Sequence, residues 1–414
     1  MQNWAGTYTY RARELHRPAS VEELRTIVSR ARSARVLGSR HSFTDIADAD
    51  ELIALDALPA AVAVDREAGT ASVTAGVTYG SLAEALRGEG VALHNLASLP
   101  HVSIGGAIAT GTHGSGDGNG NLATAVAGLE LVTPGGDLLA VTRRDPEFDG
   151  LVVGLGAAGA VVRVTLDVEP EYQVRQRVFE GLSWEALLGH FDAIAAAGYS
   201  VSVFTTWGGG DDAGQVWVKS RVADGPDHAP VELFGAPAAT AERHPIPGAD
   251  ASACTPQLGV PGLWSDRLPH FRMGFTPSQG EELQSEYFVP RQHAVAAIAA
   301  TRAVADRVRP VLQVSEIRTV AADNLWMSPH HGRDSAALHF TWRREREAVE
   351  RALEAVEAAL APFSPRPHWG KLFLTGAPAL ADQYERVPDF LALVRRLDPA
   401  GVFRNPWLSR YVPG

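Results

Sequence analysis

Helical and strand-like patterns alternate along the first 170 residues of the chain. Ser20 and Glu23 have the spacing of a capping box, and the apolar residues that follow recur at helical intervals up to residue 31. Beyond this first helix, the predicted elements are a strand at 35–37, a strand at 71–75, a helix at 81–87, and a hairpin that joins 128–132 to 138–141. This alternation indicates a domain that mixes helices with strands.

The pattern changes after about residue 171, where we expect a second domain to begin. Its apolar periodicity predicts helices near 291–307 and 344–360, each followed by a strand or loop that carries polar residues. The stretch 206–262 is rich in Gly, Pro and Asp and has little periodicity, so we expect it to form loops and hairpins. The chain as a whole is therefore predicted to belong to the α+β class.

Composition narrows the classes of partner and site. The 414 residues include 37 Lys and Arg against 48 Asp and Glu, and the net charge of −11 argues against a nucleic-acid or anionic-membrane partner. The single cysteine, Cys254, excludes an internal disulfide and a cysteine-built metal cage, and we predict no metal site. The uncharged apolar run 151–162 is shorter than the ~20 residues that span a bilayer, and the N-terminus lacks an apolar signal-peptide region. We therefore expect a cytoplasmic protein.

A glycine-rich string matches a nucleotide-binding pattern in letters but not in context. Residues 154–159 have the form GxGxxG, which in a Rossmann fold begins a helix whose N-terminus receives a pyrophosphate. The residues that follow, 161–168, alternate between apolar and polar, which is typical of a half-buried strand. We therefore interpret the string as a tight turn that binds no dinucleotide, and an NAD-dependent dehydrogenase is disfavoured for the same reason.

A second glycine-rich stretch, 98–116, has the composition of a phosphate-binding loop. Its glycines allow backbone N–H groups to approach a ligand, and Ser103, Thr110, Thr112 and Ser115 add hydroxyl donors. Such a lining suits a diphosphate without a basic residue. The residues alone are equally compatible with a flexible surface loop.

The predicted strand 311–318 carries an acid and a base on an apolar face. Leu312 and Val314 share that face with Glu316 and Arg318 because side chains two positions apart point the same way in a strand. Charged groups on an apolar face need to pair with each other or with a ligand. A salt bridge at the edge of a sheet is therefore the structural alternative to a binding site.

A second predicted strand and a C-terminal motif supply further polar groups. In 337–343, His339 and Thr341 lie on the face opposite to Leu338, Phe340 and Trp342. Lys371 ends the sequence Pro-His-Trp-Gly-Lys at 367–371. A binding protein without enzymatic activity would not need Glu316, Arg318 and Lys371 together.

Three motifs in order, 38–42 (Gly-Ser-Arg-His-Ser), 98–116 and 367–371, resemble those of the vanillyl-alcohol-oxidase flavoproteins. The similarity is to their alditol oxidases, which act on xylitol or sorbitol, and it runs from about Asn3 to Tyr411. It implies a two-part FAD-binding domain with a substrate (cap) domain. We accordingly expect an FAD-binding domain at 1–170, a cap domain at 171–375, and a segment at 376–414 that returns to the FAD-binding domain.

The resemblance also implies how FAD is held. His41 is expected to bind the 8α-methyl group of the flavin covalently, as a single tether because Cys254 lies far from any motif. His113 is expected to be a hydrogen-bonding loop residue rather than a second tether. The positions implied around FAD are Val36, Leu37, Gly38, Ser39, Arg40, His41, Ser42, Ala97, Ser98, Ser103, Gly106, Thr110, Gly111, Thr112, His113, Val162, Arg318 and His368.

The implied reaction oxidises a terminal primary alcohol of an alditol to the aldose. Its hydride passes to flavin N5, and O₂ is then reduced to H₂O₂. Glu316, Arg318 and Lys371 are the expected catalytic residues, with Arg318 or Lys371 balancing negative charge on the reduced flavin. The expected polyol-binding residues are Ser98, Gln284, Glu316, Arg318, His339, Thr341 and Lys371.

Several points remain open in the sequence. Lys371, His339 and Glu316 are all candidates to accept the hydroxyl proton. The alternative function is an aldonolactone oxidase or dehydrogenase, which shares the Glu/Arg pair and the C-terminal motif. The expected partners are a small polyol and O₂, and the sequence does not decide the oligomeric state, for which a monomer is compatible.

Overall fold

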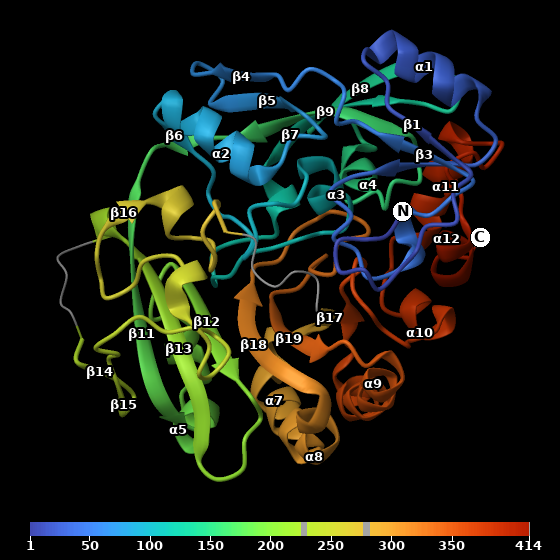
Figure 1. Cartoon of the computed structure of the whole chain (residues 1–414). Helices are drawn as coiled ribbons and strands as arrows, with labels where there is room; N and C mark the ends of the chain where they lie inside the picture. The colour runs from blue at the N-terminus through green and yellow to red at the C-terminus, as the bar shows by residue number, and fades with distance from the viewer. Residues whose placement is uncertain (225–229, 276–281, 414) are drawn as a thin grey trace.

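The computed structural model describes residues 1–224, 230–275 and 282–413, which fold into two parts (Figure 1). The first part holds a parallel sheet of order β1-β3-β2 and an antiparallel sheet of order β4-β5-β9-β7-β8. Its strands are β1 Glu14–His16, β2 Ala34–Leu37, β3 Glu51–Ala54, β4 Val62–Asp65, β5 Thr70–Thr74, β7 Val126–Val132, β8 Leu138–Thr142 and β9 Ala160–Asp167, with β6 Val91–Ala92 and β10 Glu169–Pro170 paired separately.

The helices of the first part are short and are placed as their sequence signals predict. Ser20 caps α1 by accepting a hydrogen bond from the Glu23 backbone N–H at 3.1 Å, and Glu23 accepts one from the Ala19 N–H in return. The helices are α1 Val21–Arg30, α2 Tyr79–Gly88, α3 Ile104–Ala109 and α4 Phe148–Val152. The predicted helices, strands and hairpin of this region are therefore confirmed.

The second part is built on one eight-stranded antiparallel sheet of order β16-β11-β13-β12-β18-β19-β17-β20. Its strands are β11 Gln173–Ser183, β12 Ser200–Thr205, β13 Asp212–Arg221, β16 Gly262–Leu263, β17 Glu282–Pro290, β18 Leu312–Val320, β19 Ser335–Arg343 and β20 Arg366–Pro367; β14 Glu232–Leu233 and β15 Ala236–Pro237 form a separate pair. The mixed helix and sheet content confirms the α+β class.

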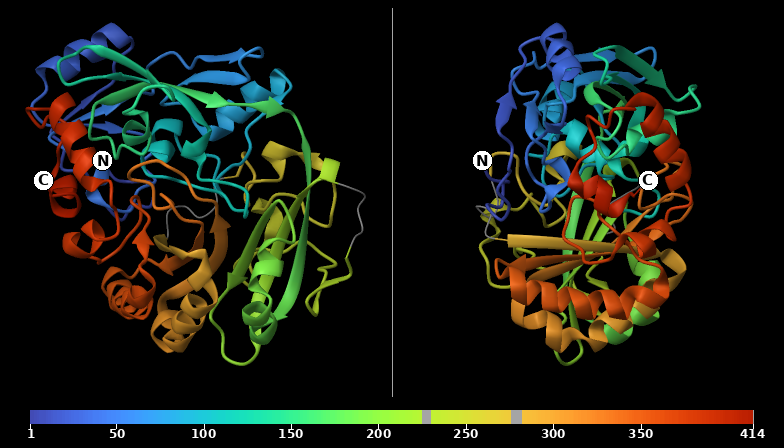
Figure 2. Two further views of the ribbon diagram at one scale, coloured as in Figure 1. Left: turned by 180° about the vertical axis from the view of Figure 1, so that it is seen from behind. Right: turned by 90° about the vertical axis from the view of Figure 1, so that its right-hand side faces the viewer.

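Helices cover the outer face of this sheet. Figure 2 shows α7 Ala294–Ala303, α8 Ala305–Val308 and α9 Arg346–Leu360 on the side that faces away from the first part. The apolar face of β19, with Leu338, Phe340 and Trp342, is fully buried. The shorter α5 Trp184–Gly189 and α6 Phe191–Ala195 complete the layer. Among the described residues, no helix combines the length and apolar character needed to cross a membrane.

The stretch 206–262 consists of loops and hairpins, as predicted. It contains β13, a ten-residue strand that forms an antiparallel hairpin with β12 on one side and pairs with β11 on the other. Residues 225–229 of the stretch lie outside the described residues. The remainder consists mainly of turns and short strand pairs.

The C-terminal segment returns to the first part, as Figures 1 and 2 show. It contains α10 Ala377–Ala381, α11 Val387–Leu397 and α12 Pro406–Tyr411. The Ala34 N–H donates to the Val402 carbonyl at 2.8 Å, which joins this segment to β2. The buried Arg35 guanidinium donates to the carbonyls of Phe403 and Gly156, so one side chain connects three distant stretches of chain.

Candidate active site

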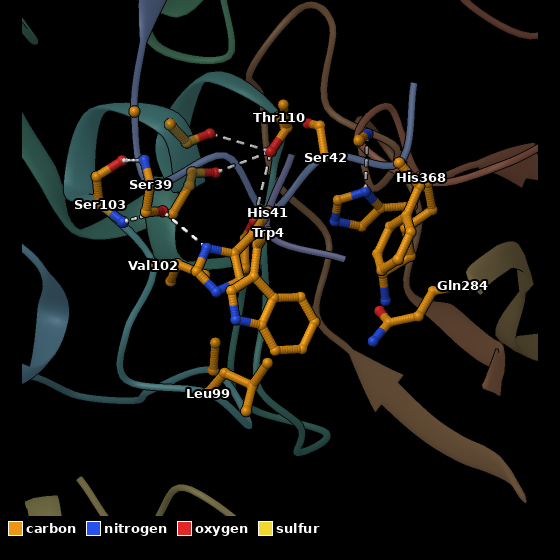
Figure 3. Close-up of a pocket in the computed structure, with 18 of the residues that line it drawn as sticks. Trp4, Ser39, His41, Ser42, Leu99, Val102, Ser103, Thr110, Gln284 and His368 are labelled. Carbon is orange, nitrogen blue, oxygen red and sulfur yellow. Dashed lines mark hydrogen bonds between the residues drawn. The ribbon is translucent and has the colours of Figure 1, made fainter. Parts of the chain in front are cut away.

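A large cavity lies between the two parts and is lined by residues from both. It encloses ≈ 2100 Å³ of empty space, its open mouth included. The first part contributes β2 and the loop after it, the glycine-rich stretch around α3, and the turn before β9. The second part contributes β17, β18, β19 and the segment 367–371. Figure 3 shows a close-up of this cavity.

The loop after β2 and the stretch before α3 are bound to each other reciprocally. The Ser39 N–H donates to Ser103 Oγ at 3.2 Å, and the Ser103 N–H donates to Ser39 Oγ at 2.9 Å (Figure 3). A Cβ at position 38 would lie only 2.3 Å from Ser103 Oγ, so this approach requires Gly38. Two of the sequence motifs therefore meet at the cavity wall.

His41 lies at the same wall, between a hydroxyl group and an indole. Its Nδ1 is 3.0 Å from Ser39 Oγ, and its ring stacks on Trp4 with 5.0 Å between the ring centroids (Figure 3). Burial lowers the pKa of His41 to about 4. The imidazole is therefore neutral near pH 7 and retains a lone pair on one nitrogen, as a nucleophile requires.

The C-terminal motif closes the cavity from the other side. The Phe43 N–H donates to the Gly370 carbonyl at 2.9 Å, which joins the motif to the loop that carries His41. Within the motif, the Gly370 N–H donates to His368 Nδ1 at 3.0 Å (Figure 3). Lys371 follows this turn and projects toward the strands of the second part, where its ammonium meets Glu286.

Glu286 on β17 is the centre of a buried charge cluster. Its carboxylate accepts hydrogen bonds from Arg318 Nη2 at 2.5 Å and from Lys371 Nζ at 2.6 Å, and His113 Nε2 lies 3.3 Å away. Burial alone would raise the pKa of Glu286, but the cations Lys371 and Arg318 outweigh it and hold the pKa well below its usual range. Glu286 is therefore ionised.

Glu316 on β18 is the second buried carboxylate of the cavity. Its Oε1 is 2.8 Å from His270 Nε2, and its Oε2 is 3.5 Å from Arg318 Nε. Burial raises the pKa of Glu316, but Arg318 and His270 outweigh this effect and lower it below the usual range. Arg318 thus contacts both carboxylates, and the cluster presents a fixed set of charges to the cavity.

The remaining predicted polyol residues line the cavity around this cluster. Arg318 Nη1 donates to Ser98 Oγ at 3.5 Å, and Gln284 Nε2 donates to Glu282 Oε1 at 2.5 Å. His339 lies between Lys371 Nζ, 2.9 Å from its Nδ1, and Thr341 Oγ1, 3.1 Å from its Nε2. All seven residues predicted to bind a polyol therefore line one cavity.

The residues predicted around FAD also line this cavity, with two exceptions. Gly111 and Val162 are not among its lining residues. Val162 points into the core at 4 % exposure, whereas the neighbouring Val161 is half-buried and lines the cavity. Successive residues of a strand face opposite sides, so the Val162 side chain is turned away from the cavity that Val161 lines. Gly111 instead turns the chain at φ +67° and packs near Pro329.

The string 154–159 is a turn followed by strand β9, as predicted from the alternation after it. However, Leu155, Gly156 and Gly159 line the cavity. The turn therefore forms part of the cavity wall, and the interpretation that it binds no dinucleotide stays a prediction. The loop 98–116 contains the short helix α3 and is not a flexible surface loop.

The strand that carries Glu316 and Arg318 lies inside the sheet. Strand β18 pairs with β12 on one side and β19 on the other, so the alternative is wrong about the sheet edge, although its Glu316–Arg318 ion pair does form, at 3.5 Å. A register shift after Leu312 places that side chain in the main core, whereas Val314 packs in a smaller cluster at the cavity. Leu312 therefore does not share the cavity face.

Several lining residues were missed by the sequence analysis. They are Glu286, His270 and Trp4, whose contacts are described above. Glu286 could have been found from the alternation of polar residues along β17, at Glu282, Gln284 and Glu286. His270 lies in a segment without periodicity, and no pattern indicates it.

Cys254 is buried, and burial raises the pKa of its thiol to about 12.

Comparison with known proteins places the chain among flavin enzymes. The family model described as "FAD binding domain" matches residues 13–142, and the model described as "D-arabinono-1,4-lactone oxidase" matches residues 271–411. An alditol oxidase from a Streptomyces strain is 49 % identical over 100 % of this chain and 99 % of its own length. An L-gulono-1,4-lactone dehydrogenase from Mycobacterium tuberculosis is 28 % identical over 99 % of this chain and 98 % of its own length.

Solved structures show the same fold. A cholesterol oxidase from B. sterolicum superimposes with a TM-score of 0.80 over 100 % of this chain and 96 % of that chain. Its sequence is only 16 % identical, so the likeness concerns the fold alone. The arrangement of an FAD-binding domain with a second domain is therefore shared with that structure.

Proposed function

Because this chain belongs to the alditol oxidase family of FAD-dependent oxidoreductases, we propose that it oxidises the terminal primary alcohol of an alditol to the aldose. Xylitol and sorbitol are the proposed substrates, O₂ the acceptor and H₂O₂ the second product. The observation that carries the proposal is one cavity that joins the glycine-rich wall of the first part to the Glu286–Arg318–Glu316 cluster of the second.

The residues of the first part fit FAD. A dinucleotide needs an extended cavity in which the backbone can come close to its diphosphate and hydrogen-bond donors can reach it. The cavity wall of the first part offers glycines together with the hydroxyl groups of Ser39, Ser103, Thr110 and Thr112. When bound, FAD supplies the hydride acceptor for alcohol oxidation and returns the electrons to O₂. The residues proposed to hold it are those of 36–42, 97–113 and His368 that line the cavity, with His41 as the covalent tether.

The polar residues of the second part suit a polyol. An alditol is neutral and carries a hydroxyl on every carbon, so it needs several hydrogen-bonding side chains in fixed positions. Glu316 is ionised and accepts a hydrogen bond from a hydroxyl, while Arg318 donates one. Ser98, Gln284 and Thr341 are proposed to bind the hydroxyls further along the chain. These contacts orient the reacting carbon and exclude water from it.

The electrostatics narrow the choice of proton acceptor. Burial and the nearby Lys371 lower the pKa of His339 to about 3, and the pKa of Glu316 is also lowered, so both are weak bases. The Lys371 ammonium must first release its proton; burial, which lowers the pKa of Lys371, favours that release, whereas Glu286 raises this pKa and stabilises the ammonium that forms when the amine takes the hydroxyl proton. We therefore favour Lys371 as the group that accepts the hydroxyl proton.

Some sequence-based expectations remain proposals. These are the boundaries 1–170, 171–375 and 376–414 for the FAD-binding domain, the cap domain and the returning segment, and a cytoplasmic location. A polyol and O₂ are the proposed partners. No nucleic acid or membrane is proposed as a partner.

Purified protein tests the proposal directly. We expect a yellow protein whose colour stays with the acid precipitate, and H₂O₂ release with xylitol and sorbitol. L-gulono-1,4-lactone is the comparison substrate, because the lactone enzymes are the alternative. H₂O₂ release with the lactone and none with either alditol would overturn the proposed substrate, and a colourless protein that does not bind added FAD would overturn the proposed cofactor.

A further inference from the structure

A lysine is buried behind the active-site cavity, and no carboxylate of the described residues contacts it directly. Lys219, on β13, is 1 % exposed. Its ammonium donates to the carbonyls of Leu268 and Pro269, the latter at 3.2 Å, and its third contact is His270 Nδ1 at 3.2 Å. Three acceptors for three N–H donors satisfy the ammonium. All three belong to the segment 268–270, which lies between the sheet and the cavity.

His270 connects this lysine to Glu316. The ring nitrogen opposite the lysine, Nε2, is 2.8 Å from Glu316 Oε1. An ammonium can only donate, so Nδ1 must accept and the ring proton must sit on Nε2. His270 Nε2–H therefore donates to Glu316, and the ring lies between a fixed donor and a fixed acceptor.

The need to hold the segment 268–270 against the sheet does not by itself explain why a lysine occupies position 219. Thr255 Oγ1 already donates to the Pro269 carbonyl at 2.8 Å, and the Thr255 N–H donates to the His270 carbonyl at 2.9 Å. A buried ammonium carries a desolvation penalty that an apolar side chain of similar length would avoid. An apolar residue could replace neither the bond to the Leu268 carbonyl nor the contact with His270 Nδ1, and only the latter reaches a side chain that lines the cavity.

We propose that Lys219 is a positioning residue for Glu316, acting through His270. By occupying Nδ1, Lys219 keeps the His270 proton on Nε2 and keeps the imidazole from taking up a second proton. Glu316 thereby remains an ionised, oriented acceptor for a substrate hydroxyl. The inference rests on the proposed function in one respect, namely that Glu316 binds the polyol.

The charges that surround the pair support this role. Glu316 and Arg318 face it from β18, and Cys254 and Arg272 lie on the chain segments that cover the same face. Ser202 Oγ on β12 is 3.5 Å from His270 Nε2. Burial first and the Lys219 charge second lower the pKa of His270 to about 4, while Glu316 opposes them. Burial also lowers the pKa of Lys219 to about 7, so the lysine is charged in the acid range where His270 would otherwise protonate.

Removal of the lysine should expose His270 to protonation. In Lys219→Met, Nδ1 loses its donor and the nearby positive charge, so a proton can bind there and form an imidazolium beside Glu316. This cation would cancel the charge that the substrate hydroxyl needs. We expect KM for xylitol to rise at acid pH, by roughly tenfold for each pH unit below the new His270 pKa, with kcat changed less.

The experiment compares pH profiles of kcat and KM from about pH 5 to about pH 9, a range that spans histidine titration. Lys219→Met should gain an acid limb, that is, a rise of KM toward low pH, that the wild type lacks. Lys219→Gln retains an N–H donor without the charge and should gain a smaller one; it also serves if the methionine variant does not fold. Thr255→Val removes a bond to the same segment but not to the ring, and its profile should follow the wild type.

Two results would overturn the inference. One is a Lys219→Met profile parallel to that of the wild type, or an equal acid limb in Thr255→Val, which would assign the lysine a role in attachment only. The other comes from ¹⁵N NMR of the wild-type holoenzyme, with His270 assigned by comparison with His270→Gln. A proton on Nδ1 would exclude the arrangement. This spectrum tests the inference even if no alditol is a substrate, an outcome that would overturn the proposed function alone.

Discussion

Lys371 Nζ lies 2.6 Å from Glu286 Oε2, in an ion pair that joins the C-terminal motif to strand β17. Glu286 is fully buried and also bonds Arg318, so one carboxylate balances two cations beside the cavity. Breaking a buried pair leaves a charge without compensation, which is costly in a low-dielectric interior. The charge state of Lys371 is therefore coupled to Glu286.

Replacement of Glu286 should change both stability and pH dependence. In Glu286→Gln, two buried cations lose their shared partner, and we expect a loss of about 3–5 kcal/mol in unfolding free energy. The pKa of Lys371, which burial lowers and Glu286 raises, should fall further. The profile of kcat against pH should shift to more acid values. Thermal unfolding and a pH–rate series measure the two effects.

Glu357→Gln is the matched control for this variant. Glu357 accepts hydrogen bonds from the Tyr287 hydroxyl, at 2.7 Å, and from Thr375 Oγ1, at 2.9 Å, on the opposite side of β17. Its loss should lower the melting temperature without moving the pH–rate profile. Equal profiles for Glu286→Gln and the wild type would show that Glu286 only supports the fold.

Loss of the Lys371 amino group should affect the chemical step. Lys371→Met keeps the length and apolar bulk of the side chain, so the fold and the bound flavin should be retained. An interaction that strengthens toward the transition state lowers kcat when it is removed, and a fall of ~10²–10³ is typical for one such electrostatic contact. The rate of anaerobic flavin bleaching at saturating xylitol measures this step.

Arg346→Met provides the comparison, because Arg346 is an exposed cation on α9 that pairs with Glu350. That variant should bleach at the wild-type rate. If Lys371→Met instead keeps the wild-type rate while KM rises, Lys371 binds the ground state and the transition state equally, and its proposed role as proton acceptor is wrong.

Buried histidines should make the protein sensitive to mild acid. The pKa is lowered to about 4 in His41, to about 4 in His270 and to about 3 in His339, in each case mainly by burial. Unfolding returns each to an ordinary value of about 6.5, so the unfolded chain binds more protons below that pH. Their contribution to stability is complete above about pH 6.5 and is lost as the pH falls toward about 4.

The histidines and the carboxylates lose their contributions to stability over different ranges of pH. The pKa values of Glu286 and Glu316 are lowered from 4.5, so their contribution is lost only at more acid pH. The melting temperature should therefore fall between about pH 6.5 and about pH 5, and His270→Gln should reduce the slope. A melting temperature that stays constant over this range would show that the histidines are not held neutral.

Local signals account for most of the fold and much of the site. The capping pair Ser20 and Glu23, the alternation in 161–168 and the face that carries Glu316 and Arg318 were read directly from the sequence and recur in the structure. These features depend on residues that are close in the chain. The positions implied around FAD came from resemblance, and all but Gly111 and Val162 line the cavity.

The features that could not be predicted from the sequence depend on packing between residues that are far apart in the chain. Whether Val161 or Val162 faces the cavity is decided by how β9 sits against β5 and β7, where the register shifts between Glu130 and Leu131. Lys219 lies in a stretch without clear periodicity, and its importance depends on a segment about 50 residues away that covers the sheet. Glu286 was recoverable from alternation, but its two cations come from β18 and the C-terminal motif.

The covalent attachment of FAD through His41 is the most direct prediction about the cofactor. His41 is neutral because its pKa is lowered, and Ser39 Oγ and the Trp4 ring fix its orientation at the wall of the cavity. A fixed, neutral imidazole is suited to attack an electrophilic methyl group. His41→Ala should still fold, and any flavin that it binds should be released by acid precipitation.

Two other histidines make the His41 test specific. His101 lies in the neighbouring loop and hydrogen-bonds the Met273 carbonyl at 3.0 Å, so His101→Ala should retain acid-stable flavin. His113 is buried beside Glu286 and hydrogen-bonds its own loop through Gly114 at 2.9 Å, and we predict that it is not a second tether. Absorbance of the acid precipitate, with peptide mapping of the flavin, compares the three variants. A covalent bond survives acid, whereas a non-covalent complex dissociates when the fold is lost. If His41→Ala keeps acid-stable flavin and the double variant with His113→Ala loses it, the tether is His113 and not His41.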